Sequence, residues 1–278
     1  MRVIVTGGSG KLGTAVVTHL EDLGHDVLVF DRVATRQPGY VPVDLRDAGQ
    51  VLDAVAGLEE HGGAPDAIVH LAAIPAPGLI PDVATFENNI LSTYHVLQAA
   101  RRAGVKKFVG ASSETTLGLP FDVPPPYIPV DEDVLAPNST YSLVKHLEEQ
   151  MEIQLCRWDP ELSITALRFS NVMAPEDYAG FEDFQDDPTL RKWNLWGYID
   201  ARDGAQAIAK ALEVRGPGFE RYIIANADTV MRTPSADLAA AVFPGVPLKK
   251  DVQGNETLLS IDKARRELGY EPAHAWQR

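Results

Sequence analysis

The sequence contains a single cysteine, Cys156, so no intrachain disulfide can form and no cysteine-rich metal site is available. No stretch approaches the roughly 20 apolar residues that a helix needs to cross a membrane. A strand-like pattern begins at Arg2, which leaves no room for a signal peptide. These absences predict a cytoplasmic protein without a metal site or a membrane partner.

Basic residues are also scarce. The 278 residues include 25 Lys and Arg against 39 Asp and Glu, which gives a formal net charge of -14. The longest basic clusters are the pairs at 101–102 and 106–107. A strongly negative protein repels nucleic acid phosphates, so we expect no nucleic-acid partner.

Glycine, by contrast, is concentrated near the start of the chain. Residues 6–13 read T-G-G-S-G-K-L-G and lie between the apolar run 3–5 and a helical pattern. Gly8, Gly10 and Gly13 match the G-x-G-x-x-G spacing, and Gly7 is an additional glycine. Such a turn lets backbone N–H groups and the start of a helix approach a pyrophosphate. The segment therefore predicts a dinucleotide-binding site.

Strand-like and helix-like patterns alternate through the first two thirds of the chain. The strand-like runs are 3–5, 27–30, 67–71, 107–111 and 164–169, and the helical runs are 12–23, 50–58, 83–102 and 140–158. This alternation predicts an α/β protein with a Rossmann-type, doubly wound parallel sheet.

The later part of the chain is less regular. Proline-rich residues 118–137 predict a loop, and helices are expected near 201–214, 235–243 and 262–268, with a short strand near 222–225. We expect residues 1–175, together with about 199–225, to form the dinucleotide-binding domain. Residues 176–198 and 226–278 are expected to form a small substrate-binding cap.

Further cofactor candidates lie at the ends of three strands: the second strand at 27–30, a third strand expected to end at 44–45, and the fourth strand at 67–71. Asp31 stands 18 residues after Gly13, where a carboxylate can bind a ribose diol and repel a 2′-phosphate, which favours NAD. Arg32 and Arg36 follow and leave NADP open as an alternative. Asn89 has two open interpretations, a solvent-facing residue or a part of the site. The other candidates are Asp44, Leu45, Leu71, Ala72 and Ala73.

Acid–base chemistry is indicated by Tyr141 and Lys145. At i and i+4 of one helix their Cβ atoms lie roughly 5–6 Å apart. A nearby ammonium favours the phenolate of a tyrosine, whose pKa is otherwise near ~10. Ser112 and Ser113 end the strand before the proline-rich loop, where a hydroxyl can hold a substrate oxygen. His70, at the end of the fourth strand, is interpreted as a structural residue.

Taken in order, these segments resemble the extended short-chain dehydrogenase/reductases, the NAD-dependent epimerase/dehydratase family. The resemblance covers nearly the whole chain and implies an NAD-dependent enzyme. It also implies a homodimer through helices 83–102 and 140–158, where Ala99, Ala100, Leu147 and Met151 suit an interface. The matching segments are T-G-G-S-G-K-L-G at 6–13, D-L at 44–45, H-L-A-A at 70–73, A-S-S-E-T-T-L-G at 111–118, Y-S-L-V-K at 141–145, R-F-S-N-V-M-A-P at 168–175 and S-I-D-K-A-R-R-E-L-G-Y-E-P at 260–272.

The resemblance assigns roles to particular residues. Tyr141 would remove the proton of a substrate hydroxyl as hydride passes to nicotinamide. Lys145 would lower the pKa of Tyr141 and bind the nicotinamide ribose. Ser113 would bind the developing carbonyl oxygen, and Asn89 would support the site. The implied cofactor contacts include Gly7, Gly10, Lys11, Leu12 and Gly13.

Two positions depart from the family pattern. Leu117 stands where many members have a tyrosine. Glu114 matches the first acid of the sugar-nucleotide dehydratases, but Thr115 replaces the second. Half of a dehydratase signature is therefore present.

The segment between Asn171 and Trp193 bears on the substrate. The two residues are only 22 positions apart, and residues 176–187 between them contain six carboxylates. A nucleotide diphosphate would be repelled there, so a small carbohydrate is expected. The compact chain is similar to the uronate dehydrogenases, which implies a sugar acid whose carboxylate Arg191 would bind. The other substrate candidates are Ile74, Ser112, Glu114, Asn171 and Trp193.

The lead hypothesis is thus an NAD-dependent oxidoreductase acting on a hydroxyl of a small carbohydrate. The alternative is a nucleotide-sugar epimerase with tightly bound NAD. A dehydratase and a non-catalytic NAD sensor are further alternatives, and the complete Ser-Tyr-Lys set argues against the sensor.

Overall fold

The computed structural model describes residues 1–33, 37–57 and 63–277, and within them a parallel seven-stranded sheet forms the centre of the molecule. Its order is β3-β2-β1-β4-β5-β6-β9, so the strand order reverses between β1 and β4. This confirms the predicted doubly wound sheet, in which ligands bind beyond the carboxyl ends of the strands at the reversal. The strands are β1 Arg2–Thr6, β2 Asp26–Asp31, β3 Tyr40–Pro42, β4 Ala67–His70, β5 Lys107–Ser113, β6 Ser163–Phe169 and β9 Gly218–Ile224.

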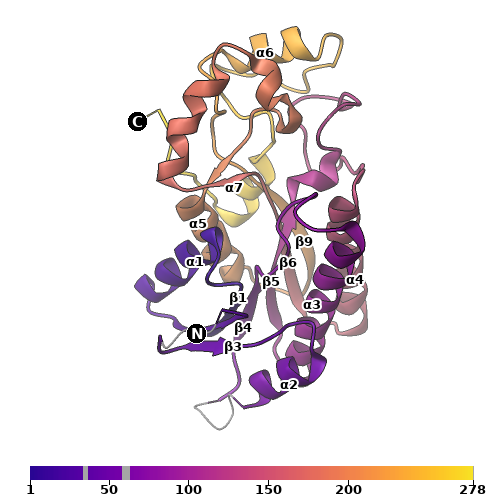
Figure 1. The fold of residues 1–278 in the computed structure, drawn as a ribbon, viewed down its shortest axis with the longest axis vertical. Helices are drawn as coiled ribbons and strands as arrows, with labels where there is room; N and C mark the ends of the chain where they lie inside the picture. The colour runs from indigo at the N-terminus through magenta and orange to yellow at the C-terminus, as the bar shows by residue number, and fades with distance from the viewer. Residues whose placement is uncertain (34–36, 58–62, 278) are drawn as a thin grey trace.

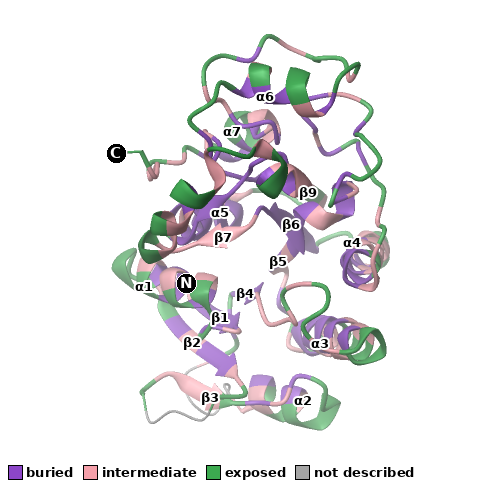
Figure 2. Ribbon diagram, turned by 45° about the horizontal axis from the view of Figure 1, so that its top comes forward, coloured by how far each residue is buried: buried purple, intermediate pink, exposed green. Residues whose placement is uncertain are grey.

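Helices cover both faces of the sheet (Figure 1). On one face α1 (Lys11–Asp22) packs against α5 (Ala201–Glu213), and on the other α3 (Asp82–Arg102) lies between α2 (Ala48–Ala56) and α4 (Thr140–Trp158). The strands are mostly buried, while the outer faces of the helices are exposed (Figure 2). Helices α1, α2 and α5 bury stripes of mostly apolar residues, as a 3.6-residue periodicity predicts, whereas α3 and α4 also bury polar and charged side chains.

The start of α4 is defined by local hydrogen bonds. The Ser139 side chain accepts from the backbone N–H of Ser142, and the Ser142 hydroxyl accepts in return from the N–H of Ser139. Such a capping box satisfies N–H groups that the first helical turn leaves free. It fixes the first turn of α4, which contains Tyr141.

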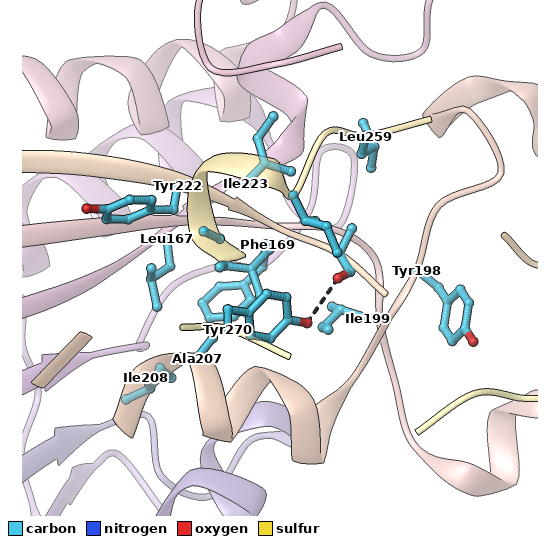
Figure 3. Packing of buried hydrophobic residues seen from close by; sticks show 14 of the residues in the cluster. Leu167, Phe169, Tyr198, Ile199, Ala207, Ile208, Tyr222, Ile223, Leu259 and Tyr270 are labelled. Atoms are coloured by element: carbon cyan, nitrogen blue, oxygen red, sulfur yellow. Dashed lines mark hydrogen bonds between the residues drawn. The ribbon is translucent and has the colours of Figure 1, made fainter. Parts of the chain in front are cut away.

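Most of the remaining elements lie beyond the carboxyl ends of the strands, among them the short pair of strands β7 Val172–Met173 and β8 Ile199–Asp200 and the helix α6. Helix α7 instead packs against β9 and α5. One apolar cluster extends from the sheet into this region (Figure 3), and Tyr270 within it donates a hydrogen bond to the carbonyl of Ala225 at 2.9 Å. The other elements are η2 Glu114–Leu117, η3 Pro175–Phe184, η4 Pro188–Asn194, α6 Ser235–Val242 and α7 Asp262–Leu268.

Several expected elements differ in detail. The strand expected near 222–225 is the full-length edge strand β9, paired with β6 over seven residues. The helix expected over 50–58 begins at Ala48, and Leu58 lies outside the described residues. Ala99 and Ala100 do not face outward as an interface requires, because both are buried in the core. None of the helices described is both long enough and apolar enough to span a membrane.

Candidate active site

A cavity of about 1120 Å³, which we call the main pocket, opens at the carboxyl ends of the central strands. It lies at the reversal of strand order, where an open α/β sheet binds its ligand. Most of the predicted site residues line it together. They are Gly7, Gly10, Lys11, Leu12, Gly13, Asp31, Arg32, Asp44, Leu45, Leu71, Ala72, Ala73, Ser112, Ser113, Glu114, Tyr141, Lys145, Asn171 and Trp193.

The glycine-rich turn has little room for side chains. Gly7 has φ +71°, and a Cβ there would lie 2.8 Å from the Ala72 backbone. A Cβ on Gly13 would lie 2.2 Å from the Gly7 carbonyl oxygen. Gly8 differs, because it does not line the main pocket and a Cβ there would lie 2.6 Å from the Val29 side chain. The glycines on the pocket wall are thus Gly7, Gly10 and Gly13, and Gly8 has the packing role among the glycines of the motif.

Asp31 closes the same end of the pocket. Its Oδ2 accepts from the Ser9 backbone N–H at 3.0 Å, and its Oδ1 accepts from the Arg32 N–H at 2.7 Å. The carboxylate is therefore fixed against the glycine turn with lone pairs left for another donor. Arg32 also lines the pocket, whereas Arg36 lies outside the described residues.

Asp44 is not a free acceptor. It forms an ion pair with Arg46 at 3.0 Å, and hydrogen bonds from that side chain hold the pKa of Asp44 below its usual value. The Asp44 carboxylate therefore lines the pocket with its charge balanced by Arg46.

Asn89 and Ile74 do not line the main pocket but hold each other behind it. Asn89 is fully buried, its Oδ1 accepts from the Ile74 N–H at 2.8 Å, and its Nδ2 donates to the Ile74 carbonyl at 3.1 Å. The solvent-facing interpretation of Asn89 is therefore wrong, and Ile74 is not among the residues that line the main pocket. The pair anchors the segment after β4 whose neighbours Ala72 and Ala73 form the wall.

Tyr141, Lys145 and Ser113 meet at the other end of the pocket, and all three are buried. Lys145 Nζ donates to the Ala111 carbonyl at 2.8 Å. Ser113 Oγ accepts from the backbone N–H and the hydroxyl of Thr115, at 3.2 and 3.0 Å. With both lone pairs used, the Ser113 proton can only be donated outward.

Burial has the largest effect on Tyr141. It raises the pKa of Tyr141 above its ordinary value, although the charge of Lys145 and a hydrogen bond with Ser113 lower it. The expected effect of Lys145 is thus present in direction but smaller than the desolvation of a buried phenol.

Glu114 is buried at the pocket wall, where η2, the end of β6 and η4 meet. Its Oε2 accepts from the Ser170 hydroxyl at 2.6 Å, and its Oε1 accepts from Asn194 at 3.2 Å. Burial raises the pKa of Glu114 to about 7, against these two hydrogen bonds and the charge of Arg191. The carboxyl can therefore donate or accept a proton near neutrality.

Arg191 does not reach the main pocket, which corrects its assignment to a substrate carboxylate. Its guanidinium donates to the Asn171 side chain at 3.1 Å and to the Gly197 carbonyl at 2.9 Å. It also stacks on Phe184 and Trp193, at 5.3 and 4.8 Å from the ring centroids. Arg191 thus supports the wall from behind, while Trp193 and Asn171 line it.

Ser112 also differs from expectation. Its hydroxyl donates to Glu149 Oε1 at 2.6 Å in a buried cluster, so its hydrogen bond points away from the cavity.

The acidic residues between 176 and 187 are mostly exposed or paired. Asp177 forms an ion pair with Lys11 at 2.5 Å, and Glu182 pairs with Arg232.

Some pocket residues gave little signal in the sequence. They come from the segment after Ile74, from the proline-rich loop and from the loop after β6: Pro75, Ala76, Pro77, Leu119, Pro120, Asp122, Asn138 and Ser170. Only the proline content of the first two segments could have indicated ordered loops at this edge.

Comparison with known proteins agrees with this geometry. The sequence model of the NAD dependent epimerase/dehydratase family matches residues 3–225. A UDP-glucose 4-epimerase from Corynebacterium glutamicum is 28% identical over 309 aligned positions, covering 99% of this chain and 92% of the relative. Because this chain has 278 residues, at least 31 of those 309 positions have no counterpart in it.

Solved structures show the same fold. A short-chain dehydrogenase/reductase superfamily protein from Agrobacterium tumefaciens, crystallised with bound NAD, has a TM-score of 0.73 and 25% identity over 100% of this chain and 94% of its own. A mutated uronate dehydrogenase has a TM-score of 0.68 and 23% identity, covering 99% of this chain and 82% of its own, and supports the fold alone.

Proposed function

The chain belongs to the NAD-dependent epimerase/dehydratase family, and from this premise we propose that it is an NAD-dependent oxidoreductase acting on a hydroxyl of a small carbohydrate. The wall formed by Gly7, Gly10 and Gly13 has no side chains, so its backbone could approach a bound diphosphate closely, and a Cβ on Gly7 or Gly13 would collide with the backbone around the turn. Asp31 would accept from the adenosine ribose, and Lys145 from the same helix as Tyr141 would bind the nicotinamide ribose. When bound, NAD would supply the hydride acceptor.

The proposed proton transfer uses three side chains. Tyr141, as phenolate, takes the proton of the substrate hydroxyl while Ser113 donates a hydrogen bond to the same oxygen. As the oxygen becomes a carbonyl, the Ser113 bond and the Lys145 charge stabilise the negative charge that develops there. This role fits the Ser113 geometry, in which Thr115 occupies both lone pairs and the remaining proton is donated toward Tyr141, where the substrate oxygen would bind.

The charges of the residues that line the pocket are our basis for proposing a class of substrate. Among the described wall residues the cations are Lys11, Arg32 and Lys145, of which Lys11 and Lys145 are ion-paired. Lys145 and Ser113 both act on Tyr141, and Glu114 lies on the same wall. A diphosphate or a carboxylate would meet no free cation there and would lie beside an acid. A small neutral carbohydrate is therefore favoured over both a nucleotide sugar and a sugar acid.

The similarity to UDP-glucose 4-epimerases favours a second candidate, an epimerase that keeps NAD bound. Such an enzyme needs space and cations for a nucleotide diphosphate. Two observations argue against this candidate. At least 31 of the aligned positions have no counterpart in this chain, and the described pocket wall beside Tyr141 has no free cation for a diphosphate.

The discriminating experiment incubates the protein and NAD with free neutral sugars, sugar acids and UDP-sugars, and measures both NADH absorbance and epimer formation. Stoichiometric NADH with neutral sugars is expected. Epimer formation without net NADH would establish the alternative, and NADH from sugar acids alone would overturn the charge argument.

The Tyr141→Phe variant should lose turnover, while its affinity for NAD stays within a few-fold of wild type. Tyr94→Phe, at an exposed tyrosine, is the matched control.

Two further expectations belong to this proposal. Residues 176–198 and 226–278 would form the substrate-binding cap, since Trp193 from this part lines the pocket. The protein would form a homodimer through α3 and α4, which expose Leu91, Tyr94, Leu143 and Trp158.

A further inference from the structure

The positive charge of Lys145 is balanced inside the protein. Lys145 Nζ donates to Glu148 Oε2 at 2.9 Å, and the two side chains are only 4% and 6% exposed. An ion pair so far from water interacts much more strongly than a surface pair. The position of the Glu148 carboxylate therefore governs the electrostatics of the Lys145 ammonium.

A hydrogen-bonded chain holds the second oxygen of Glu148. Thr93 on α3 donates to Glu148 Oε1 at 2.9 Å, His70 Nε2 lies 3.0 Å from Thr93 Oγ1, and His70 Nδ1 lies 2.8 Å from Thr6 Oγ1. Because the one Thr93 proton goes to Glu148, His70 Nε2 must donate to Thr93 and His70 Nδ1 must accept from Thr6. Burial, aided by the charge of Lys145, lowers the pKa of His70 to about 3, so the ring is neutral and has the single N–H that this order requires.

The series of hydrogen bonds from Glu148 ends at Thr6, whose other partners belong to the wall of the main pocket. Thr6 Oγ1 accepts from the backbone N–H groups of Leu71 and Ala72, at 3.2 and 3.3 Å, and both residues line the pocket. Glu148 does not line the pocket itself. Its carboxylate is thus fixed from α3, β4 and β1 as well as from its own helix.

We propose that Glu148 is a positioning residue whose carboxylate, fixed through Thr93, holds the Lys145 ammonium in place and sets the pH at which Tyr141 releases its proton. The proposal rests on the proposed function, since it takes Tyr141 as the acid–base group. Glu148 acts only through Lys145 and Tyr141 and touches no substrate.

The charged groups around Tyr141 and Lys145 make the effect specific. At Tyr141 the charge of Lys145 favours the phenolate, and the charges of Glu148 and Glu114 oppose it. Glu152, one turn of α4 beyond Glu148, also faces Lys145, but burial, with the charges of Glu148 and Glu149, raises its pKa well above the usual value and so disfavours its charged form. Removing the charge of Glu148 should therefore ease ionisation of Tyr141, and removing Glu152 should not.

The test titrates Tyr141 directly by NMR of protein labelled with ¹³C in the tyrosine rings. The signal missing from Tyr141→Phe identifies the residue. In Glu148→Gln the titration midpoint should fall by about one pH unit or more. It should stay within a few tenths of a unit in Glu152→Gln, the matched control. Glu148→Asp, which keeps the charge but withdraws it by one methylene, should lie between wild type and Glu148→Gln.

An unchanged midpoint in Glu148→Gln, or an equal shift in Glu152→Gln, would overturn the proposal. If Glu148→Gln does not fold, a wild-type midpoint in Glu148→Asp would overturn it instead. In the NAD-reduction assay the acid limb of the pH profile should move with the NMR midpoint. Absence of all turnover would refute the proposed function alone, because the NMR titration needs no activity.

Discussion

At the scale of single residues, partners decide how a buried carboxyl behaves. Glu149 and Glu114 are both almost fully buried. Although burial raises the pKa of Glu149, the bidentate pair with Arg168 reverses the effect and holds it below the usual value. Glu114 has neutral donors in direct contact, the side chains of Ser170 and Asn194 and the backbone of Asn171, and burial raises its pKa to about 7. The first is a structural ion pair, and the second is a titrating group on the pocket wall.

This difference predicts a pH-dependent stability. A carboxyl whose pKa rises from 4.5 unfolded to about 7 folded stabilises the native state at low pH, and that contribution is lost as the pH rises from 4.5 to about 7. Relative to Glu114→Gln, wild type should lose about 3 kcal/mol of unfolding free energy between these limits. Urea unfolding of both proteins at pH 4.5 and pH 8 measures the difference. The exposed Glu176→Gln is the control, and an equal pH dependence in wild type and Glu114→Gln would contradict the expectation.

Residue types at strand ends were predictable, but side-chain directions were not. Motif spacing located Tyr141, Lys145 and Ser113, since parallel strands and their following helices bring such positions to one edge. Whether Asn89 faces water or the Ile74 backbone depends on the packing of α3, which periodicity does not resolve. Arg191 was placed by charge complementarity alone, and its actual partners come from η4 and the loop after β6.

At the scale of elements, the glycine turn is where sequence dictates geometry most directly. Gly13 lies in the first turn of α1, and its Cα faces the carbonyl of Gly7. The absence of a side chain lets the helix start close to β1, so its N–H groups face the pocket.

Gly13→Ala should therefore damage both folding and cofactor binding. The added Cβ would lie 2.2 Å from the Gly7 oxygen and 2.7 Å from the Gly8 Cα, and backbone must move to relieve this. We expect a loss of at least about 2 kcal/mol in stability and a fall in NAD affinity of roughly tenfold or more, since the N–H groups are displaced by the same movement. Thermal unfolding and NAD titration by fluorescence measure the two effects. Gly180→Ala, where a Cβ would meet no atom within 4 Å, should match wild type in both assays.

Helices and strands of the sheet were predictable because their apolar periodicity is long and regular. The segments η3 and η4 were not, because short 3₁₀ turns have no sustained period. Strand β9 was underestimated for a different reason: its first half, Gly218–Arg221, is only partly buried at the sheet edge and lacks a continuous apolar run.

At the scale of the whole molecule, the pocket depends on contacts between distant segments. The Lys11–Asp177 ion pair joins the start of α1 to η3, and Glu114 joins η2 to Asn194 in η4. The apolar cluster that includes Trp196, Tyr198 and Tyr270 is continuous with the sheet. The part beyond the strands is therefore fixed to the sheet on both sides of the pocket, and the resulting wall could not be derived from local sequence patterns.

Assembly is a separate matter from this internal packing. The apolar residues that α3 and α4 expose, Leu91, Tyr94 and Leu143, would be covered in a dimer formed by the two helices of each chain. Light scattering should give about twice the monomer mass of 30.2 kDa for wild type. The double variant Leu91→Asp, Leu143→Asp should give the monomer mass, because buried unpaired carboxylates oppose the contact. Val123→Asp, an equally drastic change at an exposed position of the proline-rich loop, should leave the dimer intact. A wild-type protein that is monomeric at all concentrations would refute the assembly, and a dimer that survives the double variant would place the interface on another surface.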